Sequence, residues 1–180
     1  MRRIALLAAA AALAAVIPAR ARAQFIFGAS GGPAFPLGSF SDAYSVGYQG
    51  TVSLAVGLPG IPIGFRAEGS YDHFSANRTL TGATTTTAIR IFSGTGNIVY
   101  GLTVPIIVTP YLIGGAGAYN VACTESGCTS ATRFGFNGGV GVKFGLAGLS
   151  VSAEARAHRI SSGGGSAAIT YVPVTVGITF

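Results

Sequence analysis

Residues 168–180 alternate strictly between apolar positions and polar or small ones. The apolar positions are Val172, Val174, Val176, Ile178 and Phe180, and Pro, Thr or Gly stands between them. A period of two predicts a β-strand with one apolar face. A long apolar strand at the edge of a sheet invites pairing with other chains, whereas a closed barrel pairs its last strand with its first. The pattern therefore favours a closed barrel, with a core strand of a secreted sandwich as the alternative.

The same alternation recurs along the rest of the chain. In one segment Phe134, Phe136 and Val140 alternate with Arg133 and Asn137. In residues 107–121 both faces are apolar or glycine, so the facing of this strand does not follow from the sequence. The pattern predicts an all-β fold, an eight-stranded antiparallel up-and-down β-barrel. Its strands are residues 24–36, 47–58, 62–74, 88–102, 107–121, 133–146, 149–160 and 168–180.

The predicted connections differ on the two sides of the barrel. Those after the second, fourth and sixth strands are short, and the other four are longer and polar, including four consecutive threonines at 84–87. Short turns on one side and long loops on the other are typical of transmembrane barrels. Strands of about ten residues span a bilayer when tilted, and no apolar run after Ile17 reaches the roughly 18 residues of a spanning helix. The sequence thus predicts a transmembrane barrel with both termini on the short-turn side.

The first 23 residues have the features of a secretory signal peptide. Arg2 and Arg3 precede an apolar run, residues 4–17, and Ala21-Arg22-Ala23 supplies a cleavage site with small residues. Removal of residues 1–23 leaves one domain, residues 24–180. This domain keeps seven basic and five acidic residues, a net charge of +2. The alkaline character of the whole chain therefore gives no reason to expect a nucleic-acid partner.

The strand-and-loop rhythm, the segment PYLIGGAGAY at 110–119 and the ending VTVGITF resemble the small eight-stranded outer-membrane barrels, the OmpA/OmpX-like group. The resemblance implies a protein of the bacterial outer membrane, surrounded by lipid and lipopolysaccharide. It implies that the barrel assembly machinery reads the closing strand through Val172, Val174, Val176, Ile178 and Phe180. We expect a monomer without cofactor or metal. The expected role is structural or adhesin-like, with loops contacting extracellular surfaces, although this fold also carries other functions.

Five charged residues lie at the polar positions of their strands: Arg66, Glu68, Lys143, Glu154 and Arg156. A charge that faces lipid costs about 2–4 kcal/mol near the bilayer midplane, so these side chains should point inward. Side chains just fill an eight-stranded lumen, and buried charges must be paired. We therefore expect ion pairs between the third and seventh strands, which lie across the barrel from one another, to plug it. The alternative is a narrow channel with a polar path for ions or protons.

Three further features suggest local chemistry. Cys123 and Cys128 should form a disulfide in the oxidising periplasm, because two cysteines without a nearby histidine make a poor metal site. His73 and Ser75 resemble the His-x-Ser pair of an outer-membrane lipid A deacylase family, with Asp72 or Glu68 as the orienting acid. This pair lies early in the chain, which departs from that family. A lipid A-modifying enzyme is thus the alternative to the expected non-enzymatic role. His158 is expected to form hydrogen bonds at the barrel rim.

Overall fold

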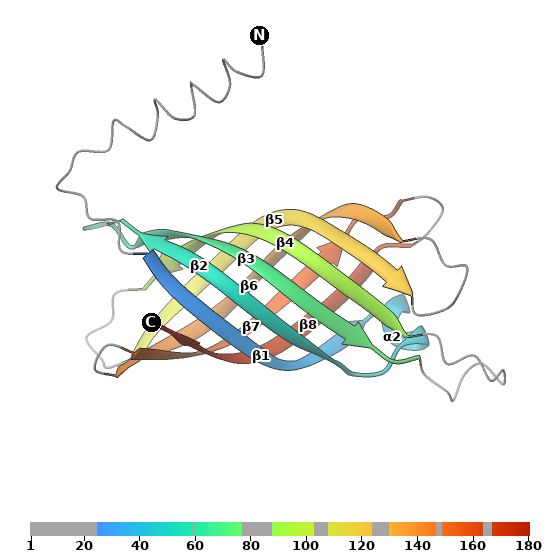
Figure 1. Cartoon of the computed structure of the whole chain (residues 1–180), viewed down its shortest axis with the longest axis horizontal. Coiled ribbons are helices and arrows are strands. Elements are labelled where there is room, and N and C mark those ends of the chain that lie inside the picture. Colours follow the sequence, from blue (N-terminus) through green and yellow to red (C-terminus); the bar gives the residue numbers. More distant parts are fainter. Residues whose placement is uncertain are drawn as a thin grey trace, which may run out of the picture.

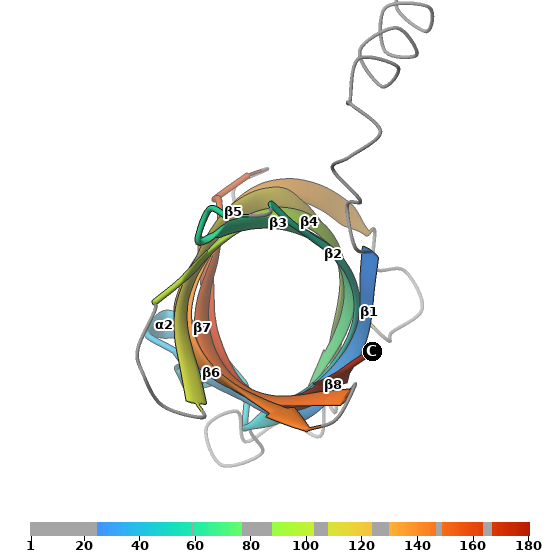
Figure 2. The same ribbon diagram turned by 90° about the vertical axis from the view of Figure 1, so that its left-hand side faces the viewer.

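The computed structural model describes residues 25–58, 60–76, 88–102, 108–123, 130–146, 149–163 and 167–180; the predicted signal peptide lies outside them. Within these residues eight strands form one closed barrel, and each strand is hydrogen-bonded to its neighbours in chain order (Figures 1 and 2). The elements are β1 (Phe25–Leu37), α2 (Ser39–Ala43), β2 (Gly47–Gly57), β3 (Ile63–Phe74), β4 (Ile89–Gly101), β5 (Val108–Cys123), β6 (Ala131–Leu146), β7 (Leu149–Ile160) and β8 (Ile169–Thr179). The predicted eight-stranded antiparallel barrel is confirmed, and its predicted strand ends are within two residues of those observed.

Strands β1 and β8 close the barrel. They pair antiparallel from Gly28–Thr179 to Leu37–Thr170. Beyond the end of β8, the backbone N–H of Phe180 donates to the carbonyl of Phe27, and the N–H of Phe27 donates to the carbonyl of Phe180, both at 2.9 Å. Because these bonds satisfy both edges, the sheet has no free strand between β1 and β8 for another chain to pair with.

Large apolar side chains cover the outside of the barrel. Phe25, Phe65, Tyr100 and Phe180 lie exposed near the short-turn end, and exposed aromatic residues near the long-loop end are Tyr48, Phe92, Phe134 and Phe136. Two aromatic girdles with an apolar band between them are typical of a barrel surface that contacts lipid. Among the described residues no helix is long and apolar enough to cross a membrane.

Strand β5, whose facing the sequence left open, pairs with β4 and β6 along nearly its whole length. Tyr111, Ile113 and Tyr119 point into the barrel and are buried, whereas Leu112 between them is exposed. Room for the two tyrosines comes from inward-facing glycines of β6. A Cβ atom added to Gly141 would lie 2.3 Å from Cζ of Tyr111, and one added to Gly135 would lie 2.7 Å from the Tyr119 ring. Close approach of these rings to the backbone therefore fixes which face of β5 points inward.

We predict that Gly141→Ala destabilises the barrel by about 1–3 kcal/mol, because the added methyl group must displace the Tyr111 ring. The free energy of unfolding in urea, measured on protein folded in detergent micelles, checks this. Gly94→Ala is the matched control, since a Cβ atom added to the outward-facing Gly94 would meet nothing within 4 Å. Equal stability of the two variants would contradict the explanation for β5.

The connection after β1, predicted as a polar loop, contains the short helix α2 at the long-loop end of the barrel (Figure 1). Its Phe40 is buried and packs edge-on against Phe74, with ring centroids 5.1 Å apart. Phe74 in turn packs against Tyr171 at 5.3 Å. These rings belong to an apolar cluster that fills this end of the lumen: Ala34, Phe40, Phe74, Ile91, Tyr119, Ile160, Ile169 and Tyr171. We call it the apolar cap.

Candidate functional site: the filled lumen

Charged side chains of β3 and β7 meet across the middle of the lumen. In a ring of eight strands these two lie opposite each other. Arg66 Nη2 lies 2.5 Å from Glu154 Oε2, and Arg156 Nη1 and Nη2 lie 2.5 and 3.0 Å from Glu68 Oε2 and Oε1. Within each strand, Arg66 Nε lies 2.8 Å from Glu68 Oε1, and Arg156 Nε donates to Glu154 Oε1 at 2.8 Å. We call these four residues the ion cluster.

Neutral side chains complete the coordination of the two carboxylates. The Tyr111 hydroxyl donates to Glu154 Oε2 at 2.8 Å, and Asn97 Nδ2 donates to Glu68 Oε2 at 2.9 Å. The Arg66 guanidinium also lies over the Tyr111 ring, 5.9 Å from its centroid. All four charged side chains are at most 15% exposed. Buried charges are tolerated when they are paired and hydrogen-bonded in this way.

Lys143, the fifth charged residue predicted for the lumen, lies apart from the ion cluster. It is half-buried on the inner face of β6, but it makes no ion pair among the described residues. It lines a cavity at the short-turn end of the barrel instead. The strand register accounts for this, because Lys143 pairs with Ser152 while Glu154 pairs with Gly141, two residues farther from the short-turn end.

A second polar layer lies between the ion cluster and the apolar cap. Gln49 Nε2 donates to Asp72 Oδ1 at 2.8 Å, and the Tyr171 hydroxyl donates to Asp72 Oδ2 at 3.2 Å. The His158 ring stacks on Tyr171 with centroids 5.0 Å apart, and its Nδ1 lies 3.0 Å from the Tyr119 hydroxyl. His158 is therefore buried inside the lumen rather than at the rim, where the sequence interpretation placed it. Gln49, Tyr119 and Tyr171 were not singled out from the sequence, and only their inward strand positions could have indicated them.

Neither acid considered for the His73 and Ser75 pair is placed to orient His73. His73 points away from the lumen, and its ring stacks on Tyr48 with centroids 5.3 Å apart. Asp72 and Glu68, the two carboxylates considered for this role, point into the lumen and are bound by other side chains. A base, hydroxyl and acid in hydrogen-bonding sequence, which nucleophilic catalysis requires, is therefore not assembled here. The described residues also contain no group of acidic, histidine or cysteine side chains that could hold a metal ion.

The remaining predicted residues lie at the two ends of the barrel. Cys123 ends β5 at the long-loop end, and the described part of the chain contains no free cysteine. Cys128 lies outside the described residues, so the bridge between the two stays a prediction. In the closing strand, Val174, Val176, Ile178 and Phe180 are exposed on the lipid side and Val172 is partly exposed. Their role in assembly also stays a prediction.

Solved structures of outer-membrane proteins share this fold. Neisserial surface protein A is 15% identical, with a TM-score of 0.69 over 86% of this chain and 95% of that one. A major outer membrane protein from Thermus thermophilus is 15% identical, with a TM-score of 0.51 over 87% and 99%. The Yersinia pestis outer membrane protein Ail is 12% identical, with a TM-score of 0.50 over 87% and 100%. At these identities the likeness concerns the fold alone. The comparison with curated proteins gave no significant match.

A family match covers almost the entire chain. Residues 4–180 match the family described as outer membrane protein beta-barrel domain. The match agrees with the closed ring of eight strands, the aromatic girdles and the apolar outer surface. These observations locate the protein in the bacterial outer membrane. The chain belongs to the outer membrane protein beta-barrel domain family.

Proposed function

We propose that this protein is a non-enzymatic, structural or surface-interaction barrel of the outer membrane with a lumen plugged by ion pairs. The observation that carries the proposal is the ion cluster, in which β3 and β7 are joined across the lumen by Arg66–Glu154 and Arg156–Glu68 contacts. A conducting path through this layer would have to separate buried, mutually paired charges, which is costly.

The space around the ion cluster supports a closed lumen. The cavity between the cluster and strands β1 and β8 measures about 20 Å³, room for roughly one water molecule. On the long-loop side, Asp72 with its partners and then the apolar cap fill the lumen. The aliphatic and phenylalanine side chains of this cap offer no polar groups to replace the hydration shell of an ion, and the hydroxyl groups of Tyr119 and Tyr171 are bound to His158 and Asp72.

We predict that the protein gives little or no steady conductance in planar lipid bilayers, because three successive layers of side chains obstruct the lumen. A general porin inserted under the same conditions serves as the positive control for insertion and detection. A large, stable, ohmic conductance would overturn the plugged lumen and favour the narrow-channel alternative.

We also predict that the protein leaves lipid A unchanged. Asp72 and Glu68 are bound inside the lumen and do not orient His73, so mass spectra of lipid A from cells with and without the protein should be identical. A shift in lipid A mass that disappears in a His73→Ala variant would restore the enzymatic alternative.

The partners follow from the two ends and the outer face of the barrel. The apolar band and girdles contact outer-membrane lipid and lipopolysaccharide. By the usual orientation of such barrels, the long loops face outside and the short turns face the periplasm. Extracellular surfaces would then be contacted at the long-loop end, where α2 exposes Ser39, Ser41 and Asp42. We further propose that residues 1–23 direct export, that the barrel assembly machinery reads β8, and that the barrel is a monomer.

A further inference from the structure

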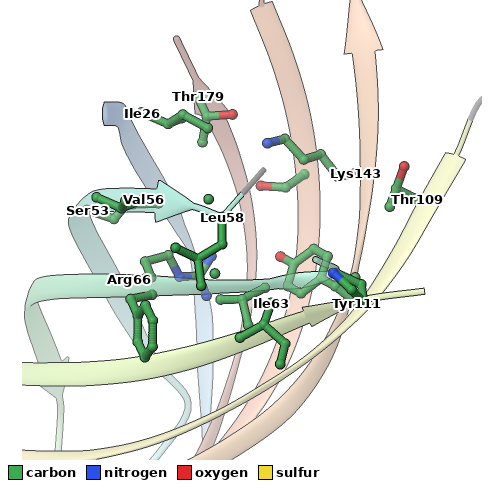
Figure 3. Close-up of a pocket in the computed structure, with 18 of the residues that line it drawn as sticks. Ile26, Ser53, Val56, Leu58, Ile63, Arg66, Thr109, Tyr111, Lys143 and Thr179 are labelled. Atoms are coloured by element: carbon green, nitrogen blue, oxygen red, sulfur yellow. The ribbon is translucent and has the colours of Figure 1, made fainter. Parts of the chain in front are cut away.

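A cavity opens into the lumen at the short-turn end, below the ion cluster. It has a volume of about 270 Å³ and is lined mainly by apolar side chains, among them Ile26, Ala55 and Val99 at inward strand positions. Its polar groups are few, and Figure 3 shows the Lys143 ammonium group and the Tyr111 side chain directed into it. An apolar cavity with a small number of convergent polar groups is the usual form of a small-molecule site.

Among the described residues, Lys143 has no acidic partner within reach. The chain contains five acidic residues. Glu68 and Glu154 are each bound by both arginines of the ion cluster. Asp72 is held in the layer beyond the cluster, and Asp42 lies in α2 at the long-loop end. The fifth, Glu125, lies outside the described residues.

The surroundings of Lys143 suit an anion. Its direct neighbours across the sheet are Thr109 of β5 and Ser152 of β7, and both line the cavity. Their hydroxyl groups can donate hydrogen bonds to an anion that the ammonium group attracts. A hydrogen bond with a charged donor or acceptor is roughly twice as strong as one between neutral groups. Arg66, at the inner end of the cavity, is neutralised by Glu68 and Glu154, which leaves Lys143 as the unpaired cation among the lining residues.

We infer that this cavity binds an alkyl carboxylate, with the carboxylate on Lys143, Thr109 and Ser152 and the alkyl chain along Ile26, Ala55 and Val99. A volume of about 270 Å³ corresponds to roughly nine water molecules. The ligand therefore has on the order of ten non-hydrogen atoms, as octanoate does. The site opens toward the periplasm in the usual barrel orientation. It is independent of the closed lumen and of any role for the long loops.

The test uses the folded barrel in lipid nanodiscs, with octanoate as the probe. Titration followed by backbone amide NMR should give saturable shifts at Lys143, Thr109 and Ser152, with residues near the apolar cap unaffected. Octanol, which has the same chain without the charge, should bind about tenfold more weakly or not at all. Empty nanodiscs measure partitioning of each probe into lipid.

Two substitutions at Lys143 separate charge from shape. Lys143→Met keeps the length of the side chain and should weaken octanoate binding about tenfold or more, whereas Lys143→Arg should retain it. The matched control is Arg133→Met, which removes a cation at the long-loop end, where Arg133 contacts the carbonyl of Ala167. It should leave octanoate affinity unchanged.

Three results would overturn the inference: no saturable octanoate binding by the unaltered protein, octanol binding as tightly as octanoate, or unchanged affinity in Lys143→Met. The first two need no variant, so they decide the matter even if Lys143→Met does not fold.

Discussion

Replacing Glu154 with alanine is expected to lower the free energy of unfolding by about 3–5 kcal/mol, the usual cost of removing one partner from a buried ion pair. Glu154 accepts hydrogen bonds from Arg66, Arg156 and Tyr111. Its loss leaves two buried guanidinium groups to share the single carboxylate of Glu68. The uncompensated positive charge, rather than the loss of one contact, accounts for the size of the effect.

A second substitution should recover part of this loss, and the two arginines should not be equivalent. In Arg66→Met with Glu154→Ala, the forked pair between Arg156 and Glu68 remains, with contacts of 2.5 and 3.0 Å. In Arg156→Met with Glu154→Ala, the remaining pair has one contact, Arg66 Nε to Glu68 Oε1 at 2.8 Å. Two-contact pairing of arginine with a carboxylate is the stronger form. The variant that keeps Arg156 should therefore be the more stable double variant.

Urea unfolding of protein folded in detergent micelles, with refolding to show reversibility, measures these differences. Ser150→Ala, at an inward position of the same strand, is the control for a substitution outside the ion cluster. Two observations would refute the pairing: a Glu154→Ala variant as stable as this control, or double variants whose losses equal the sum of the single losses.

Because it is costly to expose a charged side chain to lipid, the strands of this barrel and the inward facing of its charged residues could be predicted from the sequence. Apolar residues at every second position mark the lipid face, so the strand bounds and the inward facing of Arg66, Glu68, Glu154 and Arg156 followed from alternation. Eight strands in chain order also put the third opposite the seventh. In the structure, the pairs Arg66–Glu154 and Arg156–Glu68 join these two opposite strands across the lumen.

Alternation gives the face of a side chain but not its height along the barrel axis. Lys143 and Glu154 both face inward, yet the register between β6 and β7 separates them by two residues and leaves Lys143 in the cavity. The same limit hid the layer around Asp72, whose partners come from β2 and β8.

The apolar cap was missed for a different reason. Phe40 stands in a short Ser-rich segment, and Phe74, Ile91 and Ile160 are apolar at inward positions, against the outward rule for apolar residues in a membrane barrel. The apolar cap explains these exceptions, because its side chains bury one another under α2 instead of facing lipid. In β5 the pattern failed because glycine and apolar residues occupy both faces, and only the space over Gly135 and Gly141 decides between them.

The second large effect is expected in assembly. Phe180→Ala should reduce the folded barrel in the outer membrane severalfold, although the Phe180 side chain is 66% exposed on the lipid side. Substitution leaves both backbone hydrogen bonds to Phe27 in place, so little intrinsic stability is lost. The expected deficit arises because the resemblance of β8 to closing strands implies that the assembly machinery reads this aromatic residue.

Phe25→Ala is the matched control, because Phe25 is 62% exposed at the same end of the adjacent strand β1. Membrane fractions run on gels without boiling measure the folded protein, since an intact barrel migrates differently from an unfolded chain. Folding into synthetic lipid vesicles, which contain no assembly machinery, should be the same for both variants. If Phe180→Ala folds poorly in vesicles as well, its side chain acts through the stability of the barrel. If Phe25→Ala shows an equal loss in cells, the assembly machinery does not recognise Phe180 specifically. Because only machinery-dependent recognition predicts a loss in cells that is specific to Phe180 and absent from vesicles, the two assays together decide the role of the closing strand.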